Sequence, residues 1–279
     1  MRTKWTTATR KHPCPICQKP DWCGVNESGE LAICMRVQSS KESKNGGYIH
    51  ILKESVPDYK YIPSPKQPPK PKPVLDIDTM FMNWRNKTSA TQIDELAKIL
   101  GVSYDALRRL DPVWAKEHNA WGFPMRNELD QMTGVRLRNN QGSKWAIKGS
   151  HAGLFVPNGM ESKTLLIVEG PTDTAAGLTL GFDTIGRPSC RGQEELVVKW
   201  LSQRRYREIV LIVDNDKKDK LTGKYPGAEG VKKLAITLNK PVKVIRSPLK
   251  DIRTWLSCGL NATELNNFIN NTKAKTIEG

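Results

Sequence analysis

Residues 164–170 read TLLIVEG, and residues 208–216 read EIVLIVDND. In each stretch an unbroken aliphatic run ends at acidic side chains, and such a run is typical of a strand buried on both faces. Helical stretches follow both of them, at residues 173–180 and 227–239. Buried strands that alternate with helices predict a parallel sheet of the α/β class.

The acidic residues stand where the two predicted strands end. Glu169 ends the first strand, and Asp214 and Asp216 end the second. In α/β sheets ligands bind outside the carboxyl ends of the strands, so these carboxylates are expected to converge. Three carboxylates form an oxygen cage suited to Mg²⁺, an ion that assists phosphoryl transfer. Acidic turn residues after strands are common, and it is the combination with the strand-final Glu169-Gly170 that makes the pattern specific.

Asp173 follows the first acidic residue at a distance of four positions. It is either a further metal ligand, a helix cap or a salt-bridge partner. Arg187 follows another short strand, and the turn GRPS that contains it is expected at the same end of the sheet. Arg187 is therefore a candidate phosphate contact.

Four of the six cysteines fall within the first 34 residues, as Cys14-x2-Cys17-x5-Cys23-x10-Cys34. Clustered cysteines without an export signal are more often metal ligands than disulfides, and four thiolates form a closed structural zinc site. Trp22 lies inside this loop among basic residues. Its indole either stacks on single-stranded bases or packs beneath the metal as part of the module's core. Cys190 and Cys258 are isolated and are expected to be small, partly buried side chains.

The chain is strongly basic, with 44 Lys and Arg against 29 Asp and Glu in 279 residues and a formal net charge of +15. This excess indicates a polyanionic partner, nucleic acid before membrane. The longest aliphatic runs, 165–168 and 209–213, are far shorter than the roughly 18 residues that cross a bilayer. No secretory signal is visible at the N-terminus. A membrane protein or a secreted disulfide scaffold is therefore not expected, and the predicted location is the cytoplasm.

Seven prolines and several lysines between Val56 and Val74 predict a semi-rigid basic linker, because proline at that density excludes helix and central strand. Helical spacing in residues 91–101 and 103–110 fits either a helix-turn-helix or a small bundle packed on the next domain. Short strands between residues 121 and 155 predict an antiparallel meander. The predicted domains are a zinc module (1–54), the linker (55–74), a helical and basic subdomain (75–160) and the α/β domain (161–279).

The motifs VEGPTD and VDND, with the later PLKDIRTWL, resemble the TOPRIM domain of bacterial DnaG-type and phage or plasmid primases. The resemblance implies a TOPRIM-type parallel sheet flanked by helices, preceded by a small basic α+β subdomain and a zinc-ribbon-like module. It assigns catalytic Mg²⁺ or Mn²⁺ to Glu169, Asp214 and Asp216. Lys250 and Asp251 match the later Lys-Asp, where the aspartate assists a second metal or nucleotide site.

Residues 121–155 are similar to the basic subdomain that precedes TOPRIM in these primases. There, positive side chains hold template and nucleotide phosphates, which positions the backbone without reading its sequence. The matching candidates in this chain are Arg126, Arg136, Arg138, Lys144 and Lys148. Any one of them also fits a solvent-facing strand, but five basic residues in 23 positions favour the binding interpretation for the group.

The resemblance implies a primase of a phage, plasmid or other mobile element, which joins ribonucleoside triphosphates on single-stranded DNA. No G-x-x-x-x-G-K-[ST] loop is present, so a helicase partner is expected to be a separate protein. Two alternatives use the same features. One is a TOPRIM nuclease with water as the nucleophile, and the other is a non-enzymatic DNA-binding adaptor of the RecR kind.

Overall fold

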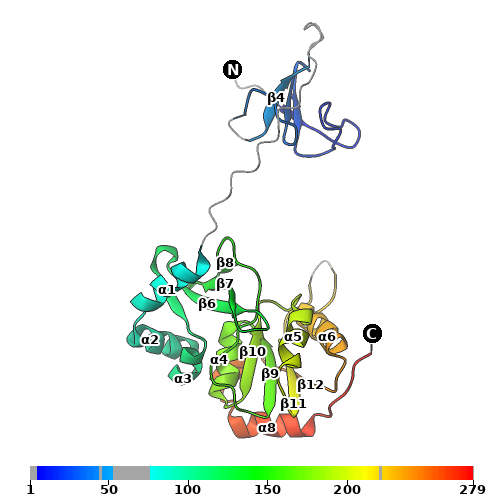
Figure 1. Ribbon diagram of the computed structural model, residues 1–279. Coiled ribbons are helices and arrows are strands. Elements are labelled where there is room, and N and C mark those ends of the chain that lie inside the picture. Colours follow the sequence, from blue (N-terminus) through cyan, green and yellow to red (C-terminus); the bar gives the residue numbers. More distant parts are fainter. Residues whose placement is uncertain (1–4, 44–45, 53–75, 220–221, 279) are drawn as a thin grey trace. The chain divides into compact units, whose positions relative to one another are not determined.

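The computed structural model describes residues 5–43, 46–52, 76–219 and 222–278 (Figure 1). The chain forms two compact units, one ending at Lys70 and the other beginning at Pro71. The predicted linker, residues 55–74, lies outside the described residues. Among the described helices, none combines the length and apolar character that a bilayer crossing requires.

The first unit is built on an antiparallel sheet with the strand order β1-β2-β3-β4. The strands are β1 (Trp5–Thr7), β2 (Gly24–Asn26), β3 (Leu31–Cys34) and β4 (Tyr48–Ile51). The buried cluster of this unit consists of Ala8 and three of the four clustered cysteines, Cys14, Cys23 and Cys34. So small an apolar core stabilises little on its own, and units of this size commonly depend on a metal.

Three helices open the second unit: α1 (Ile77–Lys87), α2 (Ala90–Leu100) and α3 (Tyr104–Arg109). Ser89 and Gln92 form a reciprocal capping box at the start of α2, and Gly101 ends that helix in the left-handed conformation. Leu107 of α3 shares a buried core with Ala175 and other residues of the α/β domain. The bundle interpretation of these helices is therefore confirmed.

A second antiparallel sheet has the order β5-β6-β7-β8 and confirms the predicted meander. Its strands are β5 (Val113–Ala115), β6 (Ala120–Arg126), β7 (Met132–Arg138) and β8 (Lys144–Ala146), with a 3₁₀ turn η1 (Lys116–His118) after β5. One face packs against α1 through Val135 and Leu137. Phe123 on the other face packs toward α2, α3 and α4.

The third sheet is parallel throughout and has the order β10-β9-β11-β12, as the apolar runs predicted. The strands are β9 (Thr164–Glu169), β10 (Asp183–Arg187), β11 (Glu208–Val213) and β12 (Lys243–Arg246). The helices are α4 (Pro171–Thr179), α5 (Glu194–Ser202), α6 (Pro226–Leu238), α7 (Ile252–Ser257) and α8 (Ala262–Asn271).

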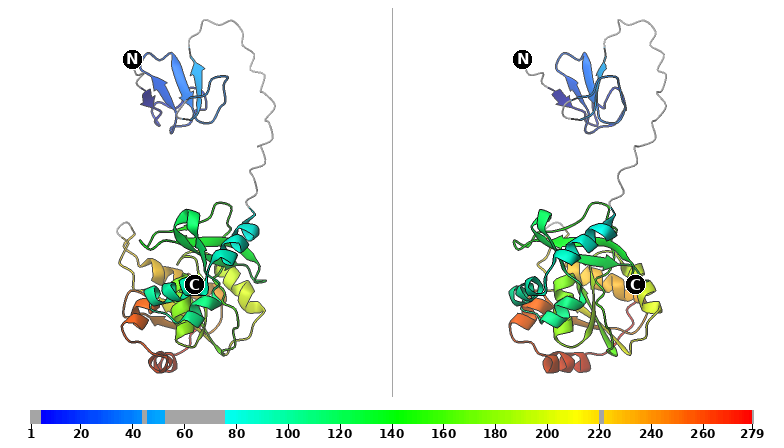
Figure 2. Two further views of the ribbon diagram at one scale, coloured as in Figure 1. Left: turned by 90° about the vertical axis from the view of Figure 1, so that its left-hand side faces the viewer. Right: turned by 60° about the vertical axis from the view of Figure 1, so that its left-hand side comes forward.

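Successive residues of the central strands β9 and β11 enter different cores. Ile167 and Val213 pack against α5 and α6, whereas Val168 and Ile212 pack against α4, α7 and α8. The antiparallel strands β6–β8 lie at one end of this sheet (Figures 1 and 2). Backbone hydrogen bonds between Phe155 and Gly186 join the segment after β8 to the edge strand β10.

Candidate functional site

The acidic residues lie at the carboxyl edge of the parallel sheet. Strand β9 is central, and its last residue, Glu169, lies opposite Arg187 at the end of β10. On its other side β9 pairs with β11 from Glu208↔Thr164 to Leu211↔Ile167, which brings the ends of the two strands level. Asp214 follows the end of β11 directly and Asp216 comes two residues later. The structure therefore places all three predicted acidic residues at one edge of one sheet.

The acidic edge lies against the start of helix α6. Glu169 alternates with Val168 and so faces the α5 and α6 side, as Ile167 does. A Cβ atom built on Gly227, in the first turn of α6, would lie 3.0 Å from Asp216 Oδ2. Glycine at this position thus lets α6 begin directly against the Asp216 carboxylate.

Asp214 lies at the same edge, with its Cβ 3.8 Å from a Cβ atom built on Gly227. Its pKa is raised from 3.8 to about 8 by burial first, and then by the negative charges of Asp173, Glu169, Asp251 and Asp216. The pKa of Glu169 is also raised, by burial and by Asp216. A divalent cation offsets this repulsion, and carboxylate oxygens are its preferred ligands. The donor set therefore fits Mg²⁺ or Mn²⁺, with Glu169, Asp214 and Asp216 as the residues that would hold the ion.

Three of the five predicted basic residues lie on one face of β7 and β8. Arg136 and Arg138 alternate with buried Val135 and Leu137, and Lys144 is the register partner of Arg138. Positive charge at Lys144 and Arg136 acts to lower the pKa of Glu169, against the effect of burial. This face of the antiparallel sheet therefore acts electrostatically on the acidic edge.

Arg138 connects the antiparallel sheet to helix α4. Its Nη1 atom donates to Thr172 Oγ1 at 3.4 Å, in the first turn of α4. Its pKa is lowered by burial and by Arg253, and the carboxylates of Asp173 and Asp251 act in the opposite direction. Arg138 thus carries positive charge toward Asp173 and Asp251, and Arg253 adds a second positive charge beside Asp173.

The other two basic candidates lie elsewhere. Arg126 donates to the backbone oxygen of Asp130 at 2.9 Å, and with Arg204 it lines a separate cavity of about 230 Å³. Lys148 is exposed in the turn after β8. A phosphate-binding role for these two residues stays a prediction.

Arg187 is buried, with 3% of its surface exposed, and its Nη1 lies 3.8 Å from Glu194 Oε1. Its pKa is lowered by burial, while Glu194 and Glu169 act to raise it. Nη1 has no hydrogen-bond partner, although Arg187, Glu169 and Asp214 line one small cavity. Arg187 therefore lies beside the acidic residues, beneath the surface of the molecule.

The predicted Lys-Asp pair stabilises the loop that carries the aspartates. The backbone N–H of Asn215 donates to the Lys250 carbonyl at 2.8 Å. The Asp251 side chain caps α7 by accepting from the Thr254 N–H at 2.6 Å. One carboxylate oxygen of Asp251 is therefore used to cap α7, and a metal-binding role for this residue stays a prediction.

Asp173 is not the cap of α4, because Gly170 occupies that position. The Asp173 carboxylate is buried, its Oδ1 has no hydrogen-bond partner, and burial followed by Asp251 raises its pKa to about 7. The helix-cap interpretation of this residue was wrong. Its direct role toward a metal stays a prediction.

The four clustered cysteines converge as the spacing predicted. Their Sγ atoms all lie within 4.8 Å of one another, and the Cys17 and Cys23 sulfurs are 3.7 Å apart. Tetrahedral zinc with Zn–S bonds of about 2.3 Å separates its sulfurs by roughly 3.8 Å, so the donor set fits zinc. The backbone N–H of Met35 donates to Cys23 Sγ at 3.4 Å, and that of Val37 donates to Cys34 Sγ at 3.3 Å. Such bonds orient the metal ligands.

Arg36 adds positive charge beside the cluster, with its Nη1 at 3.8 Å from Cys17 Sγ and 3.6 Å from Cys23 Sγ. Burial acts to raise the pKa of Cys17, but the Lys19 backbone N–H and Arg36 lower it to about 6. Trp22 is 78% exposed. The alternative in which Trp22 packs under the metal was therefore wrong, and its indole is available to a ligand.

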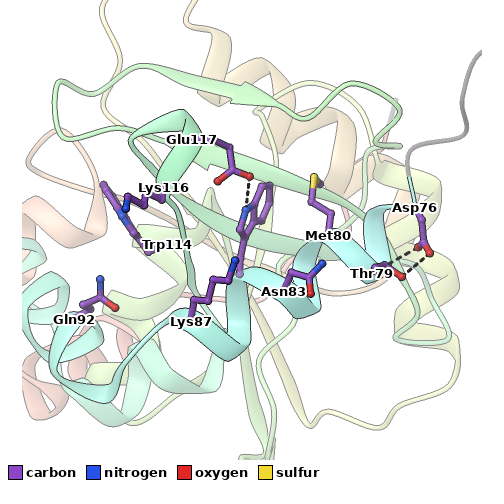
Figure 3. Close-up of a pocket in the computed structure, with 10 residues that line it drawn as sticks. Asp76, Thr79, Met80, Asn83, Lys87, Gln92, Trp114, Lys116 and Glu117 are labelled. Atoms are coloured by element: carbon purple, nitrogen blue, oxygen red, sulfur yellow. Dashed lines mark hydrogen bonds between the residues drawn. The ribbon is translucent and has the colours of Figure 1, made fainter.

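A cavity of about 1,040 Å³ lies between α1, the start of α2 and the β5–η1 segment (Figure 3). Trp84 Nε1 donates to Glu117 Oε1 at 2.6 Å in its wall. None of the predicted site residues lines this cavity. The size of a cavity therefore does not identify the acidic site in this chain.

Two residues at the acidic edge were not predicted from the sequence. Arg246 is the last residue of β12 and the register partner of Val213. Its guanidinium lies 5.0 Å from the centre of the Tyr225 ring, just before α6. Arg246 was detectable by the rule that singled out the acidic residues, because it also ends a strand of the parallel sheet. Tyr225 gave no such signal.

The second unit thus combines an antiparallel sheet with a parallel sheet whose carboxyl edge is acidic, and the first unit carries a four-cysteine cluster. No family model matches the chain, and no curated protein matches it. Solved structures do. A structure of the DnaG catalytic core is 12% identical with a TM-score of 0.53, over 71% of this chain and 79% of that one.

The zinc-binding and RNA polymerase domains of Aquifex aeolicus primase are 14% identical with a TM-score of 0.54, over 71% of this chain and 60% of that one. A chain from the bacteriophage T7 lagging-strand DNA polymerase complex with primase domains is 16% identical with a TM-score of 0.50, over 64% and 91%. The protein has the fold of DnaG-type and phage T7 primase cores.

Proposed function

We propose that this protein is a DNA primase of a phage, plasmid or other mobile element. It synthesises short RNA primers on single-stranded DNA by metal-dependent nucleotidyl transfer in the cytoplasm. The observation that carries the proposal is the convergence of Glu169, Asp214 and Asp216 at one sheet edge, near the cationic face of β7 and β8. The fold supports it, since solved structures with this fold include a DnaG catalytic domain bound to single-stranded DNA.

In this proposal the 3′-hydroxyl of one nucleotide attacks the α-phosphate of the next, and pyrophosphate leaves. Divalent cations, when bound, lower the pKa of the attacking hydroxyl and stabilise negative charge on the phosphate oxygens. Glu169, Asp214 and Asp216 hold these cations. Arg136 and Lys144 hold template or nucleotide phosphates on the opposite side, and Arg138 fixes the two sheets together through Thr172.

The zinc module supplies a separate contact with the template. Trp22 is exposed beside a cationic loop, and an exposed indole stacks on unpaired bases without strong sequence preference. A zinc site with four sulfur ligands has no open position for chemistry, so the metal's role there is structural. We expect a replicative helicase among the partners of this protein.

The test is an incubation of the full chain with single-stranded DNA, labelled ribonucleotides and Mg²⁺ or Mn²⁺. New short labelled products support the proposal. A shortened template with no new product identifies a nuclease instead, and bound but unchanged DNA identifies an adaptor. Either of these two results would overturn the assignment as a primase.

A further inference from the structure

We propose that Arg246 and Tyr225, with Lys218, form the binding site for the triphosphate of the incoming nucleotide. The inference rests on the proposed function and adds to it the residues that take the substrate's phosphate tail. It depends on how charge is distributed along the carboxyl edge of the parallel sheet.

Both flanks of the acidic residues carry an arginine. In the strand order β10-β9-β11-β12 the strands end at Arg187, Glu169, Val213 and Arg246. Adjacent strands lie about 4.8 Å apart, so Arg246 is one strand away from Asp214. Arg187 is buried and faces Glu194, whereas Arg246 is exposed. Of the two, Arg246 is the arginine that a ligand in solvent can reach.

The side chain of Arg246 lies on the α6 side of the sheet. Its neighbour Ile245 packs into the core on the α7 and α8 side, and Val213, its register partner, packs against α6. This is also the side on which Asp216 lies against Gly227. Arg246 and Asp216 therefore flank the same start of helix α6.

Among the described residues Arg246 forms no ion pair, although Asp214 and Asp216 follow the neighbouring strand β11. Its guanidinium lies 5.0 Å from the centre of the Tyr225 ring, and Lys218 Nζ lies 5.6 Å from the same centre. A ring face holds a cation in place without neutralising it. Two cations fixed in this way stay available for an anion.

The chemistry of the ligand follows from the acidic residues and the neighbouring cations Arg246 and Lys218. Carboxylates that hold a divalent cation take the reacting phosphate, and the remaining phosphates of a nucleoside triphosphate extend beyond it. Arginine binds phosphate with two parallel N–H donors, and lysine binds it as a point charge. Arg246 and Lys218 thus match the outer phosphates, which leave as pyrophosphate. A phosphodiester of the template shares this chemistry and is the competing source.

The experiment compares wild type, Arg246→Gln and Arg207→Gln. Arg207 is the matched control, because it is exposed at the amino end of β11. Two affinities of the full chain are measured by calorimetry, one for ATP with Ca²⁺ in place of the catalytic ion and one for a single-stranded oligonucleotide. We expect Arg246→Gln to weaken ATP binding about tenfold, the loss of one charged phosphate contact, with oligonucleotide affinity unchanged. Arg207→Gln should change neither.

Tyr225→Leu should also weaken ATP binding, and Tyr225→Phe should not, because phenylalanine keeps the ring. Unchanged ATP affinity in Arg246→Gln, or absence of ATP binding in wild type, would overturn the inference. If Arg246→Gln weakens oligonucleotide binding but not ATP binding, the inference is also overturned, since Arg246 would then contact a phosphate of the template. If wild type binds ATP in this Arg246-dependent way but makes no primers, the proposed function is wrong and the phosphate site is still supported.

Discussion

Arg138 Nη1 donates to Thr172 Oγ1 at 3.4 Å, and this bond joins strand β7 to the helix that begins two residues after Glu169. The contact spans 34 positions of sequence. It connects the cationic sheet to helix α4, which begins beside the residues proposed to carry the chemistry. The relative position of the two sheets is therefore tied to the site itself.

Arg138→Met is expected to lower both activity and stability. Methionine keeps much of the side-chain volume but removes the positive charge near Asp173 and Asp251. We expect a loss of about 1–3 kcal/mol in the free energy of unfolding, measured by denaturant titration, and a clear fall in primer synthesis. Lys148→Met is the control and should shift stability by less than about 0.5 kcal/mol, since Lys148 is exposed. An equal loss of stability in the two variants would show that Arg138 has no special role in holding strand β7 to helix α4.

The acidic edge should make stability depend on pH in the metal-free protein. The pKa of Asp214 is raised from 3.8 to about 8 by burial and then by neighbouring acidic residues. A raised pKa means that the folded state favours the protonated carboxyl. The stabilisation that protonated Asp214 gives the folded state is complete below the pKa of this residue in the unfolded chain. It is lost as the pH rises toward about 8.

Asp214→Asn should remove this loss of stability at high pH. At pH values above 8 and without divalent ions, we expect the variant to unfold at a higher temperature than wild type, because it carries no buried charge there. The difference should shrink near pH 4 and when Mg²⁺ or Mn²⁺ is added to wild type. Asp105→Asn, at an exposed site, is the control. A variant less stable than wild type at high pH would contradict the pKa shift of Asp214.

Zinc should be required by the first unit alone. Cys14, Cys23 and Cys34 supply most of that unit's buried cluster, so removal of the metal is expected to unfold it. Chelation or Cys23→Ser should expose residues 5–52 to protease while the thermal transition of the second unit stays unchanged. Cys258→Ser is the control, since Cys258 is exposed, not partly buried as the sequence suggested, and lies far from the cluster in sequence. Elemental analysis should give about one zinc per chain. A folded, protease-resistant first unit without metal would refute this prediction.

Trp22 should contribute to DNA binding and not to folding. Because its side chain is 78% exposed, Trp22→Ala should leave the first unit's stability nearly unchanged. We expect single-stranded DNA affinity to fall by about 1–3 kcal/mol, the effect of losing one stacked base. Fluorescence anisotropy with a labelled oligonucleotide measures this, and Ile51→Ala, at 74% exposure in the same unit, is the control. An unchanged affinity would remove Trp22 from the interface.

The parallel sheet was predictable because strands that are buried on both faces need unbroken aliphatic runs. Residues 165–168 and 209–213 are such runs. Acidic residues directly after such runs must come to one edge. The zinc cluster was predictable for a similar reason, since its ligands are close in sequence and chemically distinctive.

Contacts between distant segments were not predictable in this way. The sequence suggested that Arg126 lies near the acidic edge, but it lies beside Asp130 and Arg204. That position depends on how the turn at residues 127–131 packs on α5, which the sequence does not reveal. The pairing of Arg246 with Tyr225 depends likewise on the path from β11 into α6. Exposure of Trp22 could not be decided, since an indole suits a small core as well as a DNA surface.

The most direct test of the central claim measures template-dependent incorporation of labelled ribonucleotides by wild type and Glu169→Gln, purified and assayed side by side. Glutamine keeps the size of Glu169 and removes the charge that β9 contributes to the acidic edge. We predict primers from wild type with Mg²⁺ or Mn²⁺ and a loss of at least about a hundredfold in the variant, the scale of removing one electrostatic group that stabilises the transition state. Primer synthesis by the variant at the wild-type rate would contradict the claim that the two strands hold one catalytic centre.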